Sequence, residues 1–350
     1  MTELLLNVRG LRTTYSTGHG VVQAVRGVDL HLNRGEILGL VGESGSGKSV
    51  TCMSFLRLLK RGGTIDAGEV IFEGQDLLKM SERQLTRIRG DRVGVVFQDP
   101  MSALNPTMSV GRQVAEAVLR HRKISKAEAR ARAIELFDLV RIPSAEARID
   151  SYPHEFSGGM RQRVMIAIAL ACEPALLIAD EPTTALDVTI QRQILALLKE
   201  LRDRLGMAII LVTHDLGVIA ETADRVMVLY GGQVMEEASV GDLFAAPQHP
   251  YTRGLLAAIP DPRQTDTPLE PIPGSPPDMR APPPGCPFAP RCPEARQQCI
   301  IPPPLYGVAT GQSTNPDGGH RMRCWLADPA APARPDNAAS PRQDMARAIA

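Results

Sequence analysis

The sequence of 350 residues has no excess of charge of either sign, because 39 acidic residues balance its 39 basic ones. This balance argues against a protein that binds nucleic acid through bulk electrostatic attraction. The sequence also has no apolar run of membrane-spanning length, and its first residues lack the charged start and apolar core of a signal peptide. We therefore expect a cytosolic protein with no membrane-crossing segment of its own.

Cysteine is scarce, with six residues in the chain. In a reducing compartment, cysteines are more often metal ligands or core residues than disulfides. Cys52 and Cys172 fall in expected helices, so we interpret them as core residues. The other four lie in or soon after the stretch Pro260–Pro304, which holds 16 of the 29 prolines. They are Cys286, Cys292, Cys299 and Cys324.

The pattern with the most specific chemical meaning is Gly42–Ser49, which reads G-x-x-x-x-G-K-S. The apolar run 37–41 favours a buried strand before it, and the stretch 50–59 favours a packed helix after it. A glycine-rich loop in this context points backbone N–H groups at phosphate oxygens, and the helix N-terminus adds partial positive charge. We therefore expect nucleotide binding rather than a turn without a ligand. The expected nucleotide-binding residues are Gly42, Ser44, Gly45, Ser46, Gly47, Lys48, Ser49 and Val50.

Two residues near this loop have expected roles of their own. Lys48 is expected to reach the β- and γ-phosphates, and the Ser49 hydroxyl to hold Mg²⁺. Strands are expected at 5–8 and 28–32, in a small antiparallel sheet, with a loop at 16–20. Tyr15 lies just before that loop and can stack on an adenine ring, and a partly buried surface tyrosine is an equal alternative.

Three further apolar runs, 93–97, 175–179 and 208–212, end in polar residues. Ligands of open α/β sheets lie at the carboxyl ends of strands. Gln98 is a candidate ligand of Mg²⁺ or of the attacking water, with a solvent-facing loop glutamine as the alternative. Asp180 is a candidate Mg²⁺ ligand, and Glu181 a candidate base that polarises water for attack on the γ-phosphate. His214 is a candidate contact of the γ-phosphate, although a lone histidine is usually structural.

Residues 100 to about 152 show helical spacing of apolar side chains, which predicts a helical insert in the sheet domain. Ser157 is expected to cap a helix that starts at Gly158-Gly159. Two glycines at a helix start leave N–H groups open to an anion, and an ordinary capped helix is the alternative. A second helix is expected after the polar turn that ends at Asp187. A hairpin is expected at 226–237, around Gly231-Gly232.

These motifs, in this order, resemble the ATP-binding subunit of ABC transporters over about residues 5–245. The matching motifs are the P-loop, the Q-loop glutamine (Gln98), the family signature (Ser157, Gly158, Gly159), the acidic pair (Asp180, Glu181), the D-loop aspartate (Asp187) and the H-loop histidine (His214). The resemblance implies an α/β fold with a P-loop NTPase sheet core, an antiparallel β subdomain and a helical subdomain at about 100–160. It also implies ATP and Mg²⁺ as substrate and cofactor.

Two features are similar to the oligopeptide and dipeptide importer branch of this family. Met160 stands where the general signature often has glutamine, and 249–256 is similar to the segment that opens the C-terminal extension of this branch. The resemblance divides the chain into an ATP-binding domain (1–245), a proline-rich extension with a cysteine cluster (246–326) and a tail (327–350) that we expect to be mobile. A segment that only packs on the sheet domain is the alternative for the extension.

The four clustered cysteines favour a metal site. Zinc knuckles generally use closer pairs, whereas the steps Cys286-Pro287 and Cys292-Pro293 are typical of iron–sulfur ligation. The resemblance implies an extension able to hold a [4Fe–4S] cluster. Zinc and unliganded thiols are the alternatives, and His320 is a spare candidate ligand. A stapling role for a segment with a small core is favoured over electron transfer.

The resemblance also implies a working assembly on the cytoplasmic face of the inner membrane. Two ATP-binding subunits, identical or similar, would hold ATP between one P-loop and the partner's signature, with Ser157, Gly158, Gly159 and Asp187 as contacts from the partner. Two separate permease subunits and an extracytoplasmic solute-binding protein would complete an importer of peptides or similar small solutes.

Three other functions compete with this hypothesis. A soluble ABC ATPase of DNA repair or translation commonly has two ATPase domains or a long coiled coil, and neither is evident here. A P-loop kinase would not need the Ser157 signature or His214. A nucleotide-binding subunit that does not hydrolyse ATP would not need Glu181.

Overall fold

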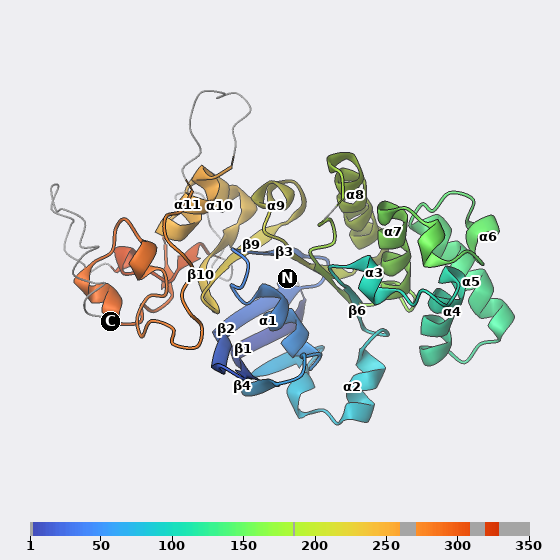
Figure 1. Ribbon diagram of the computed structural model, residues 1–350, viewed down its shortest axis with the longest axis horizontal. Helices are drawn as coiled ribbons and strands as arrows, with labels where there is room; N and C mark the ends of the chain where they lie inside the picture. Colours follow the sequence, from blue (N-terminus) through green and yellow to red (C-terminus); the bar gives the residue numbers. More distant parts are fainter. Residues whose placement is uncertain (1–2, 185, 260–270, 309–318, 329–350) are drawn as a thin grey trace. The chain divides into compact units, whose positions relative to one another are not determined.

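The computed structural model describes residues 3–184, 186–259, 271–308 and 319–328 (Figure 1). The chain forms two compact units. Unit 1 comprises Met1–Asn7, His31–Leu38 and Ile71–Thr213, and unit 2 comprises Val8–Leu30, Gly39–Val70 and His214–Ala350. The domain boundaries at 245 and 326 stay predictions. Residues 329–350 of the expected mobile tail lie outside the described residues.

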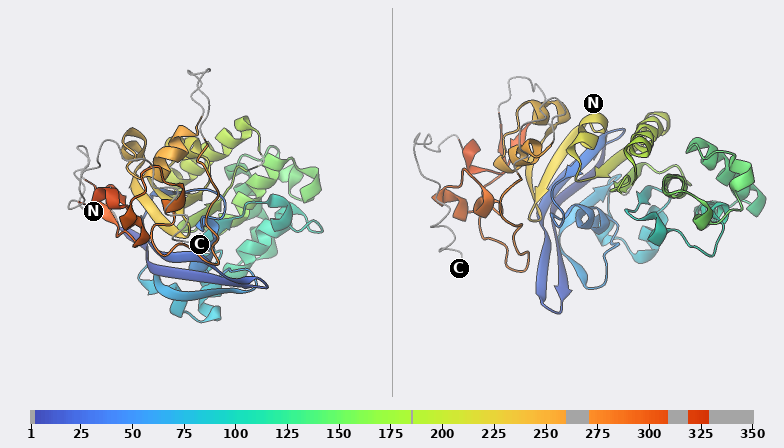
Figure 2. Two further views of the ribbon diagram at one scale, coloured as in Figure 1. Left: turned by 60° about the vertical axis from the view of Figure 1, so that its left-hand side comes forward. Right: turned by 45° about the horizontal axis from the view of Figure 1, so that its top comes forward.

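A four-stranded sheet contains β1 (Leu4–Thr17), β2 (Gly20–Asn33), β4 (Gly63–Phe72) and β5 (Gln75–Asp76), in the order β2-β1-β4-β5. The expected loop at 16–20 is wrong, because only residues 18–19 separate β1 from β2. Thr17 Oγ1 donates a hydrogen bond to the Gly20 carbonyl at 2.7 Å and accepts one from the His19 N–H at 3.2 Å, which closes the turn. Figure 2 shows the resulting hairpin in dark blue.

Unit 1 contains three parallel strands, β6 (Val93–Val96), β7 (Leu176–Asp180) and β8 (Ala208–Val212). Their register aligns Val96 with Ala179 and Asp180 with Val212. Every residue of β7 and β8 is buried, which explains why both read as continuous apolar runs. The three strands predicted from these runs are confirmed, and their carboxyl ends lie at one edge of the sheet.

The helices expected in the helical insert are present in unit 1, where they group together (green in Figure 1), and the bounds 100–160 of the helical subdomain stay a prediction. Its helices are α3 (Pro100–Ala103), α4 (Val110–His121), α5 (Lys126–Leu139), α6 (Ala145–Arg148) and α7 (Gly158–Ala169). Helices α4, α5 and α7 pack against one another. Unit 1 also holds η1 (Leu77–Lys79), α2 (Glu82–Ile88), η2 (Pro153–Glu155) and α8 (Val188–Leu205).

Unit 2 contains β9 (Arg225–Tyr230), β10 (Gln233–Ser239), β12 (Arg321–Met322) and β11 (Tyr306–Gly307), paired antiparallel in that order. The predicted hairpin of β9 and β10 is confirmed. Gly231 and Gly232 have φ angles of 55° and 74°, which the two-residue turn between twisted strands requires. Strand β3 (Ile37–Val41) has residues in both units.

The helices of unit 2 are α1 (Lys48–Phe55), α9 (Leu216–Thr222), α10 (Val240–Ala245) and α11 (Pro250–Ala257). The described part of the extension otherwise has little regular structure, with the short helices η3 (Ala289–Arg291), η4 (Gln297–Ile300) and η5 (Trp325–Ala327). Among the described residues, no helix is both long and apolar enough to span a membrane.

Candidate nucleotide-binding site

The P-loop of unit 2 connects β3 to the start of α1, as its sequence predicts. Two of its glycines have left-handed φ angles and lie close to backbone atoms of other segments. A Cβ at Gly42 (φ +145°) would lie 2.1 Å from the Leu229 carbonyl oxygen, and one at Gly47 (φ +101°) 2.5 Å from the Ala24 carbonyl oxygen. Only glycine fits such positions, so the loop shape is enforced by contacts as well as by torsion angles.

Lys48 is buried at the first position of α1, and its side chain contacts the P-loop. Its ammonium donates hydrogen bonds to the carbonyls of Gly42 at 2.8 Å and Glu43 at 3.0 Å. Ser49 follows in the first turn. The N–H groups of this turn face the loop, as phosphate binding requires.

Helix α1 is shorter than its apolar sequence predicts. It begins at Lys48, two residues early, and ends at Phe55 rather than Leu59. Arg57 adopts a left-handed φ of 52°, which is incompatible with a continuing right-handed helix. Apolar composition alone therefore does not define where this helix ends.

Tyr15 lies in strand β1 and is half-buried. Its ring packs closely on Gly63, where an added Cβ would lie 2.8 Å from Tyr15 Cε1. This packing is compatible with the surface-tyrosine alternative. Stacking of Tyr15 on adenine stays a prediction.

In unit 1, the ends of β6 and β7 bring Gln98 and Glu181 together. Gln98 Nε2 donates to Glu181 Oε2 at 2.9 Å, and Thr184 Oγ1 donates to the same oxygen at 2.9 Å. Asp180 is the last residue of β7 and is 8% exposed. Two carboxylates and an amide thus gather at one edge of the sheet, and these are suitable ligands for Mg²⁺ and a suitable base for water.

Glu181 itself has a left-handed φ of 48°. A non-glycine residue rarely adopts this conformation, and such residues concentrate at functional sites. The backbone N–H of Glu181 donates to the Val212 carbonyl at 2.9 Å, which fixes the turn after β7. The side chain is therefore aimed by the backbone as well as by Gln98.

The signature residues begin α7. Ser157 Oγ accepts a hydrogen bond from the Met160 N–H at 3.4 Å, so the predicted helix cap is confirmed. A Cβ at Gly159 would lie 2.6 Å from Ile190 Cγ2, so this glycine allows α7 to approach α8 closely. Asp187 caps α8 by accepting from the Ile190 N–H at 2.9 Å. Contact of these residues with ATP of a partner subunit stays a prediction.

His214 follows β8 and is exposed at the start of unit 2. The next residue, Asp215, caps α9 by accepting from the N–H groups of Gly217 and Val218 at 2.8 and 3.3 Å. This cap fixes the backbone beside His214. The expected contact of His214 with the γ-phosphate stays a prediction.

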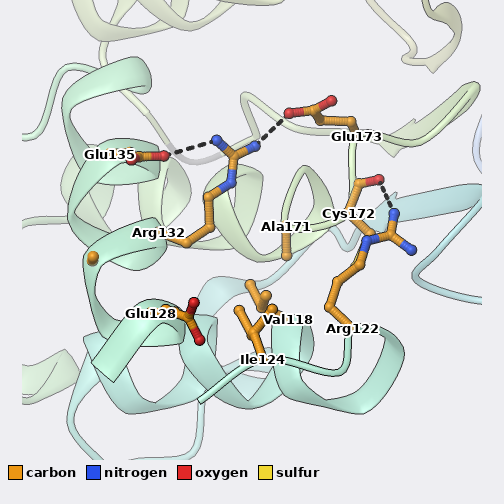
Figure 3. Close-up of a pocket in the computed structure, with 10 residues that line it drawn as sticks. Val118, Arg122, Ile124, Glu128, Arg132, Glu135, Ala171, Cys172 and Glu173 are labelled. Atoms are coloured by element: carbon orange, nitrogen blue, oxygen red, sulfur yellow. Dashed lines mark hydrogen bonds and ion pairs between the residues drawn. The ribbon is translucent and has the colours of Figure 1, made fainter. Parts of the chain in front are cut away.

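A separate pocket lies between helices of the insert, and Arg132 is paired with two acidic side chains of its lining (Figure 3). Arg132 forms ion pairs with Glu135 at 3.0 Å and with Glu173 at 2.7 Å. Arg122 donates to the Cys172 carbonyl at 3.0 Å. Cys172 is buried as predicted, in the turn after α7 rather than within the helix. These contacts connect α5 and the segment after α4 to the turn that follows α7, so we interpret them as structural.

The four cysteines of the extension are buried and line one cavity together with Phe288 and Trp325. Each sulfur accepts a hydrogen bond from a backbone N–H, for example Cys299 from Arg296 at 3.4 Å and Cys324 from Leu326 at 3.5 Å. Burial raises the pKa of all four thiols, to about 12 for Cys292 and about 11 for Cys324, although these N–H groups act in the opposite direction.

Four cysteine sulfurs are the type of ligand set that iron–sulfur clusters use. Across the residues that the structure describes, however, no group of three or more His, Cys, Asp and Glu side chains is arranged to hold a metal ion. His320, the spare candidate, is paired elsewhere, with Nε2 2.5 Å from Glu236 Oε1. The metal site therefore stays a prediction.

Comparison with known proteins decides the family. Residues 25–184 match the family model described as "ABC transporter", and residues 235–299 match "Oligopeptide/dipeptide transporter, C-terminal region". A probable peptide ABC transporter ATP-binding protein of Sinorhizobium fredii is 53% identical over 93% of this chain and 96% of its own length. The dipeptide transport ATP-binding protein DppD of Bacillus subtilis is 49% identical over 93% of this chain and 96% of its own.

This chain belongs to the ABC transporter family, in its oligopeptide/dipeptide branch. It is an ABC-type ATPase. The dimeric ABC cassette MJ0796, solved in a post-hydrolysis state with ADP and phosphate, is 31% identical, with a TM-score of 0.61 over 67% of this chain and 98% of that one. The cbiO1 protein of Clostridium perfringens is 31% identical, with a TM-score of 0.60 over 70% and 92%. The fold predicted for the ATP-binding part is thus confirmed as an ABC cassette.

Sequence reasoning missed one residue of the loop of this ABC ATPase. Glu43 is a variable position in the P-loop pattern, and it pairs with Arg291 of the extension through two charged hydrogen bonds of 2.6 and 3.0 Å. Arg291 directly precedes Cys292, and nothing in the sequence distinguishes it from Glu294 and Arg296, the other charged residues of this segment.

Proposed function

We propose that this chain is the ATP-hydrolysing subunit of an importer for peptides or similar small solutes, with solute passage through separate permease subunits. The observation that carries the proposal is the sequence identity of about 50% to peptide-transport ATP-binding proteins along nine-tenths of the chain, the extension included. General ABC cassettes cover only about two thirds of the chain.

In the proposed reaction, the P-loop binds the phosphates, with Lys48 on the β- and γ-phosphates. Bound Mg²⁺, held by Ser49, Gln98 and Asp180, would neutralise charge that develops on the phosphate oxygens. Glu181 accepts a proton from the attacking water, and its hydrogen bonds from Gln98 and Thr184 hold its carboxylate in place. His214 steadies the γ-phosphate, and Tyr15 stacks on the adenine.

The proposed second half of each ATP site comes from a partner subunit of the same kind. Ser157, Gly158 and Gly159 would present the N-terminus of α7 to ATP bound by the partner, with Asp187 nearby. The dimeric MJ0796 cassette supports a paired arrangement. The partner is identical or a similar chain.

Glu181→Gln tests the catalytic role directly. The glutamine keeps the size of the side chain and removes its basicity, so we expect ATP turnover in the assembled complex to fall at least about 100-fold while ATP still binds. Lys48→Ala is the matched control, because it should abolish ATP binding itself. Unchanged turnover in Glu181→Gln would contradict the assignment.

The proposed contact with the permeases lies beside Gln98. Phe97 and Met101 are large apolar side chains close together in the sequence that are 43% and 62% exposed, and exposed apolar side chains that form a patch mark interaction surfaces. Their position would connect the permeases to Gln98. A solute-binding protein on the other side of the membrane would deliver the solute, and this subunit would be peripheral on the cytoplasmic face.

Co-purification with the permeases tests this surface. The double substitution of Phe97 and Met101 by serine should reduce the amount of permease recovered, with intrinsic ATP binding unchanged. Val21→Ser is the control, because Val21 is also exposed, at 51%, and lies in β2. Equal recovery for all variants would exclude Phe97 and Met101 as the contact.

We further propose a [4Fe–4S] cluster at the four cysteines, with Zn²⁺ as the alternative. A single Zn²⁺ holds sulfur at about 2.3 Å and needs tightly gathered ligands, whereas a four-iron cluster accepts ligands spread around a larger cavity. The four buried cysteines that line one cavity support this proposal, and such a cluster would staple the short helices of the extension to one another.

Anaerobic purification tests the metal. The expected protein is brown, with about four iron and four sulfide per chain and loss of colour in Cys292→Ser. Cys52→Ser, in helix α1, should keep the colour. A colourless protein with stoichiometric zinc would support the alternative and exclude the cluster.

A further inference from the structure

The residue Glu43 of the P-loop has contacts both within the loop and with the C-terminal extension. Its carbonyl accepts a hydrogen bond from Lys48 Nζ at 3.0 Å, and its N–H donates to Tyr251 Oη at 2.8 Å. Its carboxylate receives two hydrogen bonds from Arg291, at 2.6 and 3.0 Å. The first contact is within the loop, and the other two come from the C-terminal extension. One loop residue thus connects the extension to the phosphate-binding lysine.

Arg291 is built into this position. Its side chain is 5% exposed, and all five of its N–H donors are used. Besides Glu43, the acceptors are Tyr230 Oη at 3.1 Å, the Ile272 carbonyl at 3.1 Å and the Pro273 carbonyl at 2.9 Å. A bidentate pair between arginine and a carboxylate fixes direction as well as distance, so Arg291 holds the Glu43 side chain in one orientation.

Tyr251 is held just as firmly. It is fully buried at the start of α11, and its ring packs on Tyr230 and Phe288, with centroids 4.6 and 5.2 Å apart. Burial raises the pKa of the Tyr251 hydroxyl, so the group stays neutral and can accept the Glu43 N–H at any physiological pH. The guanidinium of Arg291 lies 5.7 Å from the Tyr230 ring centroid, within the range of a cation–π contact.

We propose that Tyr251 and Arg291 are positioning residues for ATP, which hold Glu43 and thereby set the place of the Lys48 ammonium and the adjoining loop N–H groups. The proposal rests on nucleotide binding by the P-loop. It gives the extension a task in the ATPase cycle: a loop that would otherwise sample several conformations is kept in the one that binds phosphate. The residues that do so lie about 200 or more positions away in the sequence.

Two substitutions separate positioning from simple folding. Tyr251→Phe removes only the acceptor for the Glu43 N–H and keeps the ring in its aromatic cluster. We expect the Kd for ATP to rise about fivefold, as for loss of one neutral hydrogen bond. Arg291→Met removes the charged pair, and we expect a rise of about tenfold or more, with Arg291→Lys recovering part of the loss because it keeps a charge but not the bidentate geometry.

Glu43→Gln completes a double-mutant cycle. If Arg291 acts through Glu43, the double variant Glu43→Gln with Arg291→Met should bind ATP about as well as the weaker single variant. The matched control is Arg225→Met, which breaks another buried pair of unit 2, with Glu237. We expect this control to lower the Tm and to leave the Kd for ATP unchanged.

The measurements are titrations of the purified full-length chain with a fluorescent ATP analogue, with Tm recorded for every variant. Unchanged affinity in folded Tyr251→Phe would overturn the proposal, even if Arg291→Met failed to fold. Equal loss of affinity in Arg225→Met would also overturn it, because the effect would then follow general stability. Failure of the proposed nucleotide role is distinguishable, since Lys48→Ala would then bind the analogue as well as the unsubstituted chain.

Discussion

Individual residues of the P-loop are constrained in different ways, although their glycines look alike in the sequence. Gly42 has no room for a side chain, because a Cβ would lie 2.1 Å from a backbone oxygen. Gly45 has a left-handed φ of +78° but open space around it. The first constraint combines overlap with torsion strain, and the second is torsion strain alone. Their consequences for stability should differ.

We expect Gly42→Ala to lower the free energy of unfolding by about 3 kcal/mol or more, since the Leu229 carbonyl cannot move without disturbing β9. Gly45→Ala should cost about 1 kcal/mol, the cost of a left-handed conformation for a non-glycine residue. Chemical denaturation of the nucleotide-free chain measures both. Equal losses of unfolding free energy in the two variants would show that the loop can shift to make room for a Cβ at Gly42.

At the scale of elements, two helices approach each other at a glycine. The first turn of α7 meets the first turn of α8 where Gly159 faces Ile190, and a Cβ there would lie 2.6 Å from Cγ2. The signature glycine therefore has a packing role beside its proposed contact with ATP. A test must separate these two roles.

We expect Gly159→Ala to lower the free energy of unfolding by about 2 kcal/mol, the usual cost of a tight overlap in a packed contact. Adding Ile190→Ala should recover part of the loss, because it removes the overlapping methyl group. Gly158→Ala is the control: its Cβ would meet Leu186 at an ordinary 3.5 Å. If the double variant is no more stable than Gly159→Ala, overlap with Ile190 is not the cause of the lost stability.

The elements that could be predicted from sequence are those determined by residues close together in the chain. The P-loop, the buried strands and the cap at Ser157 follow from glycine spacing, apolar runs and capping chemistry. The end of α1 and the strand at Ser16 could not be predicted, because they depend on one left-handed residue and on one turn. The pairing of Glu43 with Arg291 joins residues 248 positions apart, and no local pattern encodes it.

At the scale of the whole molecule, the extension is tied to the hairpin of unit 2 by a buried charge. Glu236 of β10 is fully buried and contacts His320, and its oxygens accept the N–H groups of Gln248 and His249 at 2.7 and 2.9 Å. Burial alone would raise the pKa of this carboxyl. Hydrogen bonds from His320 and the two N–H groups outweigh burial and lower the pKa below its ordinary 4.5.

A carboxyl with a lowered pKa stabilises the fold at pH values above its unfolded pKa, and this contribution is lost as the pH falls through the folded value. We therefore expect the free energy of unfolding to decline below about pH 4.5, in part because of Glu236. Glu236→Gln should cost about 3 kcal/mol at pH 7 and show a shallower decline in acid. Denaturation from pH 7 to 3 measures this, and Glu116→Gln, on the exposed face of α4, should match the unsubstituted chain. If the free energy of unfolding of Glu236→Gln declined as steeply in acid, the Glu236 carboxyl would be excluded as a cause of the pH dependence.

The pairing of β12 with β10 also affects how the protein is made. Translation delivers β10 and Glu236 long before β12 and His320, which lies 84 residues further along. During that interval the edge of β10 is open, and the Glu236 carboxylate lacks its histidine. Open strand edges invite pairing with other chains. The last part of the extension to leave the ribosome is thus the part that closes the hairpin, so an interrupted synthesis would release a chain with an exposed edge and a buried charge not yet fully paired.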